Sequence, residues 1–353
     1  MKKLIQLIIL FISFAYSQGG IVSGFISDSS SGEALIGANV MIQETGQGMA
    51  TDINGYYIIQ NINPGSYTLM ASYVGFRVSR IQIIISDEES IKKDIEMVED
   101  LVQLTQVDVT AEKLQRRNNI QPSKINLSPR MMKAAPALAE PDLFRTIQAL
   151  PGVLTTSEYS TGLVIRGGNT DQNLIMLDGI TVYNPSHLGG VFSNFIVDGV
   201  KEAELIKGAY NAEYGGRLSA VLNVISREGN QKEFKGKANI SLLSAQTTLE
   251  GPFYKGAWIL SGRRTYFDLV LPKVLPDNIA TNIPPYFFYD VQGHIFSDIS
   301  SKDRFSLSYY TGIDDILFDT FGLDGRWGNN TISGHWRRVF SERLVGNFLV
   351  ANS

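Results

Sequence analysis

The chain has 353 residues, of which 44% are hydrophobic, 19% are charged and none is cysteine. This composition is too apolar for a disordered chain, and it excludes a disulfide scaffold, a cysteine-ligated metal site and a lipidated N-terminal cysteine. The net charge of -4, without a basic block, excludes nucleic acid as a partner, while the high content of glycine and aromatic residues favours β-structure.

The first 17 residues predict an export signal. Lys2 and Lys3 precede an apolar run from Leu4 to Phe14, and the small residues Ala15 and Ser17 follow. This order is typical of a secretory signal peptide. The alternative, a membrane anchor, needs about 20 apolar residues, more than this run contains. Since no other window is as long and apolar, any membrane-embedded part should be a β-barrel.

Residues 18–98 predict a small β-sandwich, because short extended runs alternate with turn signals such as Asn54-Gly55 and Pro64-Gly65. The pattern T-G-x-x-x-A-T-D-x-x-G-x-Y-x-I, from Thr45 to Ile59, resembles the carboxypeptidase-regulatory-like domain. The resemblance implies a module without chemistry of its own. The zinc signature of the peptidases, a His with a Glu three residues later, is absent because the three histidines are followed at that offset by Gly190, Ser297 and Arg338.

Residues 99–130 predict a linker, since they are polar, lack periodicity and are interrupted by Pro122 and Pro129. Within the linker, residues 106–111 alternate over a very short span.

One short helix is predicted where the next domain, residues 131–229, begins. Pro141 suits a first helical turn, and Asp142 favours the positive end of a helix. Pro151-Gly152 should end it. One face of this helix is apolar, formed by Leu143, Ile147 and Leu150.

Strands follow the helix. The sequence predicts extended segments at 163–166 and 174–177, and a two-residue turn at Asp178-Gly179 from which residues 180–183 return. A glycine-rich loop comes next and should lie at the apex of the domain.

The stretch KGAYNAEYGGRLSAVLNVIS, residues 207–226, raises the question of a phosphate-binding loop. Neither the P-loop pattern nor G-x-G-x-x-G occurs, and the alternation after Gly216 predicts a strand and not a helix. We therefore expect Gly215 and Gly216 to permit a tight turn or a close backbone approach.

Four motifs in order, I-R-G-G at 165–168, L-D-G at 177–179, E-L-I-K-G at 204–208 and Y-G-G-R-L-S-A-V-L-N-V-I-S at 214–226, resemble the plug domain of TonB-dependent outer-membrane receptors. The resemblance covers residues 105–229. It implies structural roles for Gly167, Asp178, Gly179, Gly208, Gly215 and Gly216.

With that family in view, the alternating run in the linker resembles a TonB box, which a periplasmic partner could add as a strand to its own sheet. The alternative is a stray linker strand. The box consists of Gln106, Val107, Asp108, Val109, Thr110 and Ala111.

Residues 230–353 predict the first strands of a transmembrane β-barrel, because Phe305, Leu307 and Tyr309 alternate with Ser306 and Ser308. The same alternation recurs at 234–242, 289–295 and 332–337. A soluble β-domain is the alternative. The polar tract 314–330 is expected to be a loop. About 120 residues supply about five or six strands, whereas small barrels have about eight and plugged transporters about 22. We therefore expect a partial barrel from a truncated or partial gene product.

Two groups of side chains are candidate sites. Tyr183, Asn184 and His187, in the apical loop, offer a stacking face, an amide and an imidazole to a polar ligand. The alternative is ordinary loop structure, with His187 bonded to a backbone carbonyl. Arg166 and Lys207, at strand ends, are expected to form ion pairs between plug and barrel.

The expected fold class is mainly β: a small β-sandwich, an α+β plug and an incomplete barrel. The resemblance implies TonB-dependent uptake of a ligand across the outer membrane, with a periplasmic regulatory-like domain and box. The implied partners are a TonB-type protein, membrane lipids, an unidentified extracellular ligand and, as an open alternative, a surface lipoprotein. No catalytic residue, metal or cofactor is expected. A signalling or adhesive outer-membrane protein without transport is the alternative function.

Overall fold

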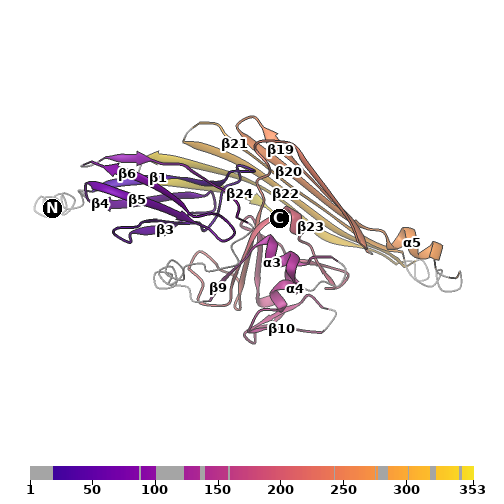
Figure 1. Ribbon diagram of the computed structural model, residues 1–353. Coiled ribbons are helices and arrows are strands. Elements are labelled where there is room, and N and C mark those ends of the chain that lie inside the picture. Colours follow the sequence, from indigo (N-terminus) through magenta and orange to yellow (C-terminus); the bar gives the residue numbers. More distant parts are fainter. Residues whose placement is uncertain are drawn as a thin grey trace, which may run out of the picture. The chain divides into compact units, whose positions relative to one another are not determined.

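The computed structural model of the chain describes residues 19–86, 89–100, 123–135, 140–157, 160–241, 243–274, 276, 285–300, 302–318, 323–341 and 344–353 (Figure 1). The chain divides into two compact units, Met1–Leu114 and Gln115–Ser353. Strands dominate both units, which confirms the mainly β fold class. The predicted signal peptide and the predicted TonB box lie outside the described residues. Among the described helices, none is long and apolar enough to cross a membrane.

The first unit is the expected small sandwich. In one sheet the central strand pairs antiparallel with β4 and parallel with β7 and β8. These strands are β1 (Gly20–Asp28), β4 (Tyr56–Ile62), β7 (Ser90–Lys92) and β8 (Ile95–Met97). The second sheet runs in the order β3 (Gly48–Ala50), β2 (Asn39–Ile42), β5 (Gly65–Ser72) and β6 (Ser79–Ile85). Apolar side chains from both sheets form the shared core, which includes Val22, Val40, Tyr57 and Leu69.

The second unit begins with the plug, a five-stranded sheet with two helices. The strand order is β13 (Ile180–Thr181), β12 (Leu174–Leu177), β17 (Val221–Ser226), β16 (Val200–Ile206) and β9 (Lys124–Leu127). The helices are α3 (Pro129–Ala134) and α4 (Leu143–Gln148). Two short hairpins and two 3-10 turns complete the plug: β10 (Val153–Thr155) with β11 (Leu163–Ile165), β14 (Ser186–His187) with β15 (Phe192–Ser193), η1 (Thr170–Gln172) and η2 (Val197–Gly199).

Local signals in the sequence account for α4 and for the β12–β13 hairpin. Asp142 caps α4, because its side chain accepts a hydrogen bond from the Arg145 amide at 3.0 Å. Pro141 precedes the cap and is therefore outside the helix, not in its first turn as predicted. Asp178 and Gly179 have φ of 50° and 82°, as a two-residue hairpin turn requires.

The strand β9 lies within residues 99–130, the range predicted as linker. The helix α3 starts at the last two residues of that range. Four residues that include Lys124 and Asn126 show no long apolar alternation, so this strand was not predicted. It forms because β16 offers a pairing edge, and the Lys124 ammonium lies 2.5 Å from a Glu204 carboxylate oxygen.

Seven antiparallel strands in consecutive order form the rest of the second unit, and we call them the wall. They are β18 (Lys235–Ile240), β19 (Ser244–Phe253), β20 (Gly256–Thr265), β21 (Tyr286–Asp298), β22 (Asp303–Phe318), β23 (Leu323–Ser341) and β24 (Leu344–Asn352). A helix, α5 (Phe267–Val274), lies between β20 and β21. The wall is an open sheet of barrel-like strands.

The wall departs from the prediction in two ways. It has seven strands where about five or six were expected, because very short turns join several of them. The tract 314–330 is largely strand and not a loop, since β22 and β23 are 16 and 19 residues long and stay paired there. Asp314, for example, lies opposite Trp327.

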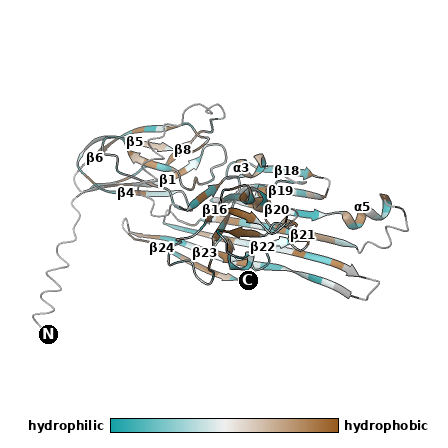
Figure 2. Ribbon diagram, turned by 90° about the horizontal axis from the view of Figure 1, so that it is seen from below, coloured by the Kyte–Doolittle hydropathy of each residue, from teal (hydrophilic) through white to brown (hydrophobic). Residues whose placement is uncertain are grey.

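The two faces of the wall differ in polarity, and hydrophilic and hydrophobic segments alternate along its strands (Figure 2). Side chains that point toward the plug are mostly polar and buried, such as Ser261, Arg263 and Gln292. The opposite face exposes large apolar side chains. They include Leu260, Phe305, Leu307, Ile332 and Val350.

Candidate functional site: the plug–wall interface

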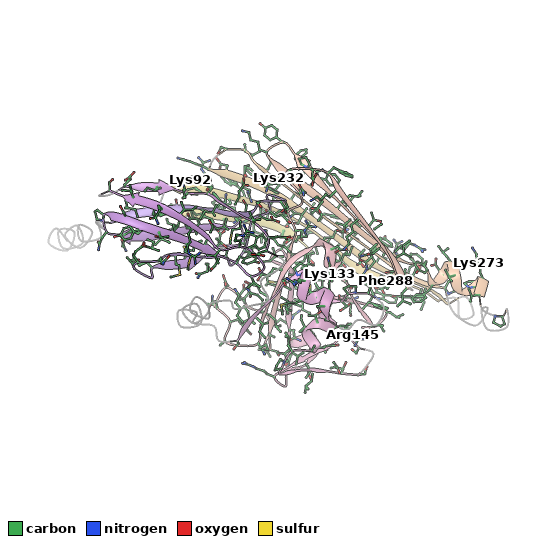
Figure 3. The ribbon with its side chains drawn as sticks, in the orientation of Figure 1. Lys92, Lys133, Arg145, Lys232, Lys273 and Phe288 are labelled. Carbon is green, nitrogen blue, oxygen red and sulfur yellow. The ribbon has the colours of Figure 1, made fainter. Side chains whose placement is uncertain are left out.

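The plug meets the inner face of the wall through the β14–β15 hairpin and the segment before α4. Phe288 of β21 and Lys133 of α3 both lie in this region (Figure 3). His187, at the end of β14, is fully buried although it belongs to a loop-rich segment. Its ring stacks on Phe288, with centroids 4.1 Å apart and an interplanar angle of 6°.

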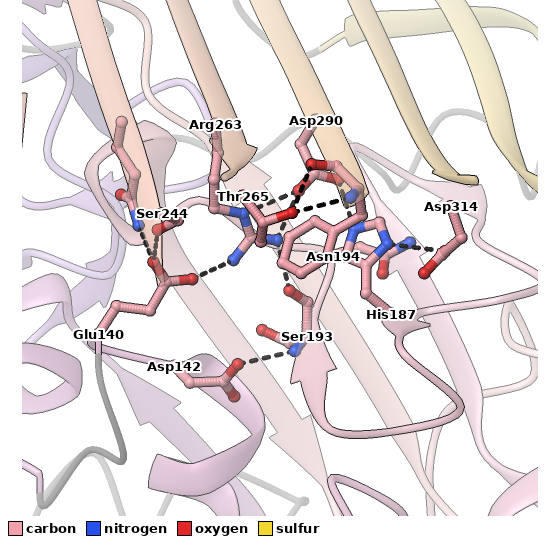
Figure 4. A network of polar contacts seen from close by, with 12 residues as sticks. Glu140, Asp142, His187, Ser193, Asn194, Ser244, Arg263, Thr265, Asp290 and Asp314 are labelled. Carbon is pink, nitrogen blue, oxygen red and sulfur yellow. Dashed lines mark hydrogen bonds and ion pairs between the residues drawn. The ribbon is translucent and has the colours of Figure 1, made fainter. Parts of the chain in front are cut away.

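His187 lies between two carboxylates of the wall (Figure 4). Its Nε2 is 2.8 Å from Asp290 Oδ1 and its Nδ1 is 2.8 Å from Asp314 Oδ2. Because an ionised carboxylate only accepts, both ring nitrogens donate, and the arrangement fits the imidazolium. Burial alone would lower the pKa of His187, but the charge of Asp290 and the hydrogen bonds to both carboxylates hold that pKa above its ordinary value.

Arg263 of β20 is the second buried cation at this interface. Its Nη1 donates to Glu140 Oε1 of the plug at 2.7 Å, and its Nε donates to Asp290 Oδ2 at 2.8 Å. Its Nη2 donates to the carbonyl of Ser193 in β15, also at 2.7 Å. Arg263 therefore joins two plug segments to the wall strands β20 and β21 (Figure 4).

We call Glu140, His187, Arg263, Asp290 and Asp314 the interface network. All five are buried, and they comprise two cations and three carboxylates when His187 is protonated. Further hydrogen bonds satisfy the remaining oxygens: Gln246 and Ser244 donate to Glu140, Tyr310 donates to Asp290, and Leu188 and Tyr286 donate to Asp314. A buried charge that loses its partner is costly, so removal of any member should weaken the contact between plug and wall.

A second group of ion pairs crosses the same interface farther along the strands. The closest contacts join Arg227 to Glu250 at 2.7 Å, Lys237 to Asp198 at 2.8 Å and Arg304 to Glu228 at 3.2 Å. Lys133 of α3 also lies 2.5 Å from Asp198. Burial raises the pKa of Asp198, but the two lysines outweigh it and leave the pKa below its usual value.

Comparison with known proteins identifies the sandwich and the plug. Residues 22–109 match the CarboxypepD_reg-like domain, and residues 127–221 match the TonB-dependent Receptor Plug Domain. The chain therefore carries a CarboxypepD_reg-like domain followed by a TonB-dependent receptor plug domain.

Relatives are similar to this chain over part of their length. TonB-dependent receptor P26 of Formosa agariphila is 28% identical over 233 residues, which are 61% of this chain and 22% of that protein. TonB-dependent transporter Oar of Myxococcus xanthus is 24% identical over 241 residues, 65% of this chain and 22% of that protein. The chain thus spans about a fifth of the length of these relatives. The siderophore receptor PirA of Pseudomonas aeruginosa has a TM-score of 0.47 and 16% identity, over 65% of this chain and 40% of that chain.

Arg166 and Lys207, predicted to form ion pairs between plug and wall, donate to neighbouring plug segments. Lys207 Nζ donates to the carbonyl of Pro151 at 2.8 Å, and Arg166 Nη2 donates to Ser123 Oγ at 3.4 Å. Neither residue forms an ion pair with a wall carboxylate in the part of the chain that the structure describes. Both lie at ends of plug strands, where carbonyls and hydroxyls of neighbouring plug segments are closer than the wall.

The apical residues of the plug divide into exposed and buried ones. Tyr183 is 70% exposed and stays available to a ligand. The backbone amide of Asn184 donates to Asn329 Oδ1 of β23 at 3.1 Å, so it is tied to the wall. His187 is buried in the interface network, which contradicts its prediction as a ligand contact.

Among the plug glycines predicted to be structural, Gly215 is the one whose backbone differs from the expectation. Gly216 has φ of 78°, as expected for a turn, but Gly215 does not, and a Cβ at Gly215 would meet nothing within 4 Å. A crowded position is Gly168 of the I-R-G-G motif, where a Cβ would lie 2.5 Å from the Cβ of Ser219. Positive φ also occurs at other predicted structural residues, Gly167, Asp178, Gly179 and Gly208.

Sequence reasoning missed most of the interface network. Alternation along β21 indicated that Asp290 faces inward, but nothing local indicated its partners. No local pattern indicated that Glu140, Arg263 and Asp314 belong to the network, apart from the charge of each in otherwise apolar surroundings.

Proposed function

We propose that this chain acts in TonB-dependent uptake of a ligand across the outer membrane, as the regulatory-like domain, plug and adjoining barrel strands of a receptor. The match to the plug family supports this function. The observation that carries it is the buried interface network, which holds the plug against the polar inner face of a wall whose other face is apolar. We retain the proposed limits 18–98, 99–130, 131–229 and 230–353, with β9 joining the plug across the second boundary.

The outer face of the wall supports a location in the membrane. Phe305, Trp336 and Phe348 stack there, with successive centroids 5.5 and 5.0 Å apart. Barrels carry such aromatic residues where lipid meets water. In bacterial barrels short turns face the periplasm and long connections face outside. The turns at 254–255 and 299–302 would then be periplasmic, and the long β20–β21 connection extracellular. Residues 1–17 would direct export, and the regulatory-like domain would be periplasmic.

The interface network suggests what energy from a TonB-type partner is used for. The partner would bind residues 106–111 as an added strand and pull on the linker that leads to β9. A path through the receptor opens only if plug segments leave the wall, and the contacts of Glu140 and His187 must then be broken. Because these charges are buried, separation is costly without work from outside. No covalent step is required, so we assign no enzymatic activity.

The ligand would approach the plug near Tyr183, whose ring is exposed beside the Asn184–Asn329 contact. An exposed aromatic side chain offers a stacking face to many chemical classes, so the ligand is not identified. A surface lipoprotein as a further partner stays an open part of the proposal.

The test is uptake by the full-length receptor with Val109→Pro. Proline removes a backbone donor from the box, so energised uptake should be lost while ligand binding to intact cells is retained. Asn118→Pro places the same change in the linker outside the box and should leave both intact. Normal uptake by the Val109→Pro receptor would contradict the role of the box. Ligand binding without energy-dependent uptake in the unmodified receptor would instead favour a signalling or adhesive protein.

A further inference from the structure

The helix α5 begins on the outward side of the wall. Arg263 points inward and is buried, so the next residue of β20, Arg264, points outward. The Arg264 guanidinium lies over the ring of Phe287 of β21, 4.5 Å from its centroid. It also forms a bidentate ion pair with Asp268 in the first turn of α5, with N–O distances of 2.7 and 3.2 Å.

Past this anchor, α5 exposes apolar side chains. Leu269 is 55% exposed, Val270 is 41% exposed and Val274 is 72% exposed, all within one short helix. Lys273 lies among them in the last turn, at the end of the wall (Figure 3). Scattered single apolar residues on a surface are ordinary, but three on one short helix form a patch that favours removal from water.

The patch continues an apolar surface that is already present. The outward face of the wall exposes Leu260 on β20 and Leu307 on β22. The register places Arg264 opposite Tyr289, nearer than Leu260 to the end of β20 from which α5 starts. Arginine and tyrosine are typical of the level at which lipid meets water.

We propose that α5 lies in the interfacial layer of the outer leaflet, with Leu269, Val270 and Val274 among the acyl chains. This inference rests on the proposed function, which makes the outward face of the wall the lipid-facing one. The outer leaflet is the layer that contacts the apolar patch of α5, because it must surround the rim of the wall where α5 is anchored. Lys273, with its long apolar stem, can keep its ammonium at the lipid headgroups.

The absence of cysteine from these 353 residues allows a direct test. Leu269→Cys and Val274→Cys receptors, labelled with an environment-sensitive fluorophore, are inserted in vesicles of phosphatidylcholine and phosphatidylglycerol. We expect blue-shifted emission that brominated lipid quenches and aqueous iodide does not. Val74→Cys, at a side chain of the regulatory-like domain that is 77% exposed, serves as the aqueous control and should show the reverse.

Leu307→Cys separates the failure of this inference from the failure of the proposed function. Quenching by brominated lipid at Leu307 but not at α5 would overturn the inference and leave the membrane location standing. Quenching by iodide at both places would overturn both. Labels on α5 that are shielded in whole cells but open to iodide in vesicles would mean that a protein covers the helix, which also overturns the inference.

Discussion

At the scale of single residues, the charge of His187 decides how firmly the plug is held. His187→Asn keeps at most one of the two hydrogen bonds and removes a cation that faces two buried carboxylates. Loss of one partner from a buried ion pair costs about 3–5 kcal/mol. We expect a loss of that order in the unfolding free energy of the plug, measured by hydrogen exchange of the β16 and β17 amides. The control His294→Asn removes a contact with the Ser308 hydroxyl and no buried ion pair, and an equal loss there would contradict the assignment.

The same residue predicts a pH dependence. The pKa of His187 is raised in the folded protein, so its stabilisation is complete below the unfolded value of about 6.5 and is lost as pH rises through the folded value. Burial, and then the charge of Glu204, raise the pKa of Glu202 to about 7. Glu202 therefore adds a separate loss of stability between about pH 4.5 and 7. As pH rises, the plug should become less stable in both ranges. Glu202→Gln should remove the loss of stability at lower pH, and His187→Asn should remove the loss at higher pH. A loss of stability at higher pH that persists in His187→Asn would mean that another group titrates there.

The sequence predicted the type of these residues better than their partners. Alternation along β21 indicated that Asp290 faces inward. Its partner His187 is 103 positions away in the chain, and no local pattern carries that information. For Arg166 and Lys207 the sequence predicted a distant carboxylate as partner, and the structure shows a nearby partner instead. A cation at a strand end can donate to a nearby carbonyl or hydroxyl as well as to a distant carboxylate.

At the scale of elements, the I-R-G-G turn depends on close packing. A Cβ at Gly168 would lie 2.3 Å from Ser219 Oγ and 2.5 Å from Ser219 Cβ. The hydroxyl can rotate but the Cβ cannot, so Gly168→Ala should destabilise the plug by roughly 1–3 kcal/mol. Gly215→Ala, at an open position, should change the stability by less than about 0.5 kcal/mol. Chemical denaturation compares the two, and Ser219→Gly should partly rescue Gly168→Ala if crowding is the cause.

The cap of α4 also positions the interface network. Asp142 accepts from the Arg145 amide and, with its other oxygen, from the Ser193 amide at 2.7 Å. Ser193 in turn accepts from Arg263. Asp142→Ala removes a cap and leaves a buried donor unpaired, so we expect a loss of roughly 2–4 kcal/mol. Asp142→Asn can keep the cap but not both acceptors. Its melting temperature should fall between those of the unmodified protein and Asp142→Ala. Equal melting temperatures for Asp142→Asn and Asp142→Ala would mean that the cap contributes little.

Elements with local signals were predicted, whereas β9, which forms only by pairing, was not. The cap and the Asp178-Gly179 turn act within a few residues, so α4 and the β12–β13 hairpin follow from sequence. The strand β9 exists only because β16 offers it an edge. The tract 314–330 is polar enough for a loop, yet β22 and β23 remain paired along the part of it that the structure describes, because each supplies the other's backbone partners.

At the scale of the whole molecule, a plug that is fixed to the wall should prevent uptake. The contact between Asn184 of the plug and Asn329 of β23 suits a test, because the amide of one lies 3.1 Å from the side chain of the other. Asn184→Cys with Asn329→Cys would form a disulfide between plug and wall under oxidising conditions. If plug segments must leave the wall, the oxidised receptor should bind ligand normally, lose energised uptake and regain it on reduction.

The matched control for this disulfide lies within the wall. Ser308 and Ser333 are directly opposite on β22 and β23, so cysteines there join two wall strands and leave the plug free. Uptake by this control should be insensitive to oxidation. Full uptake by the oxidised Asn184→Cys, Asn329→Cys receptor, with the cross-link verified, would mean that the ligand passes while this part of the plug stays attached. The path would then open on another side of the plug, and the interface network would serve as a fixed anchor and not as a contact that breaks.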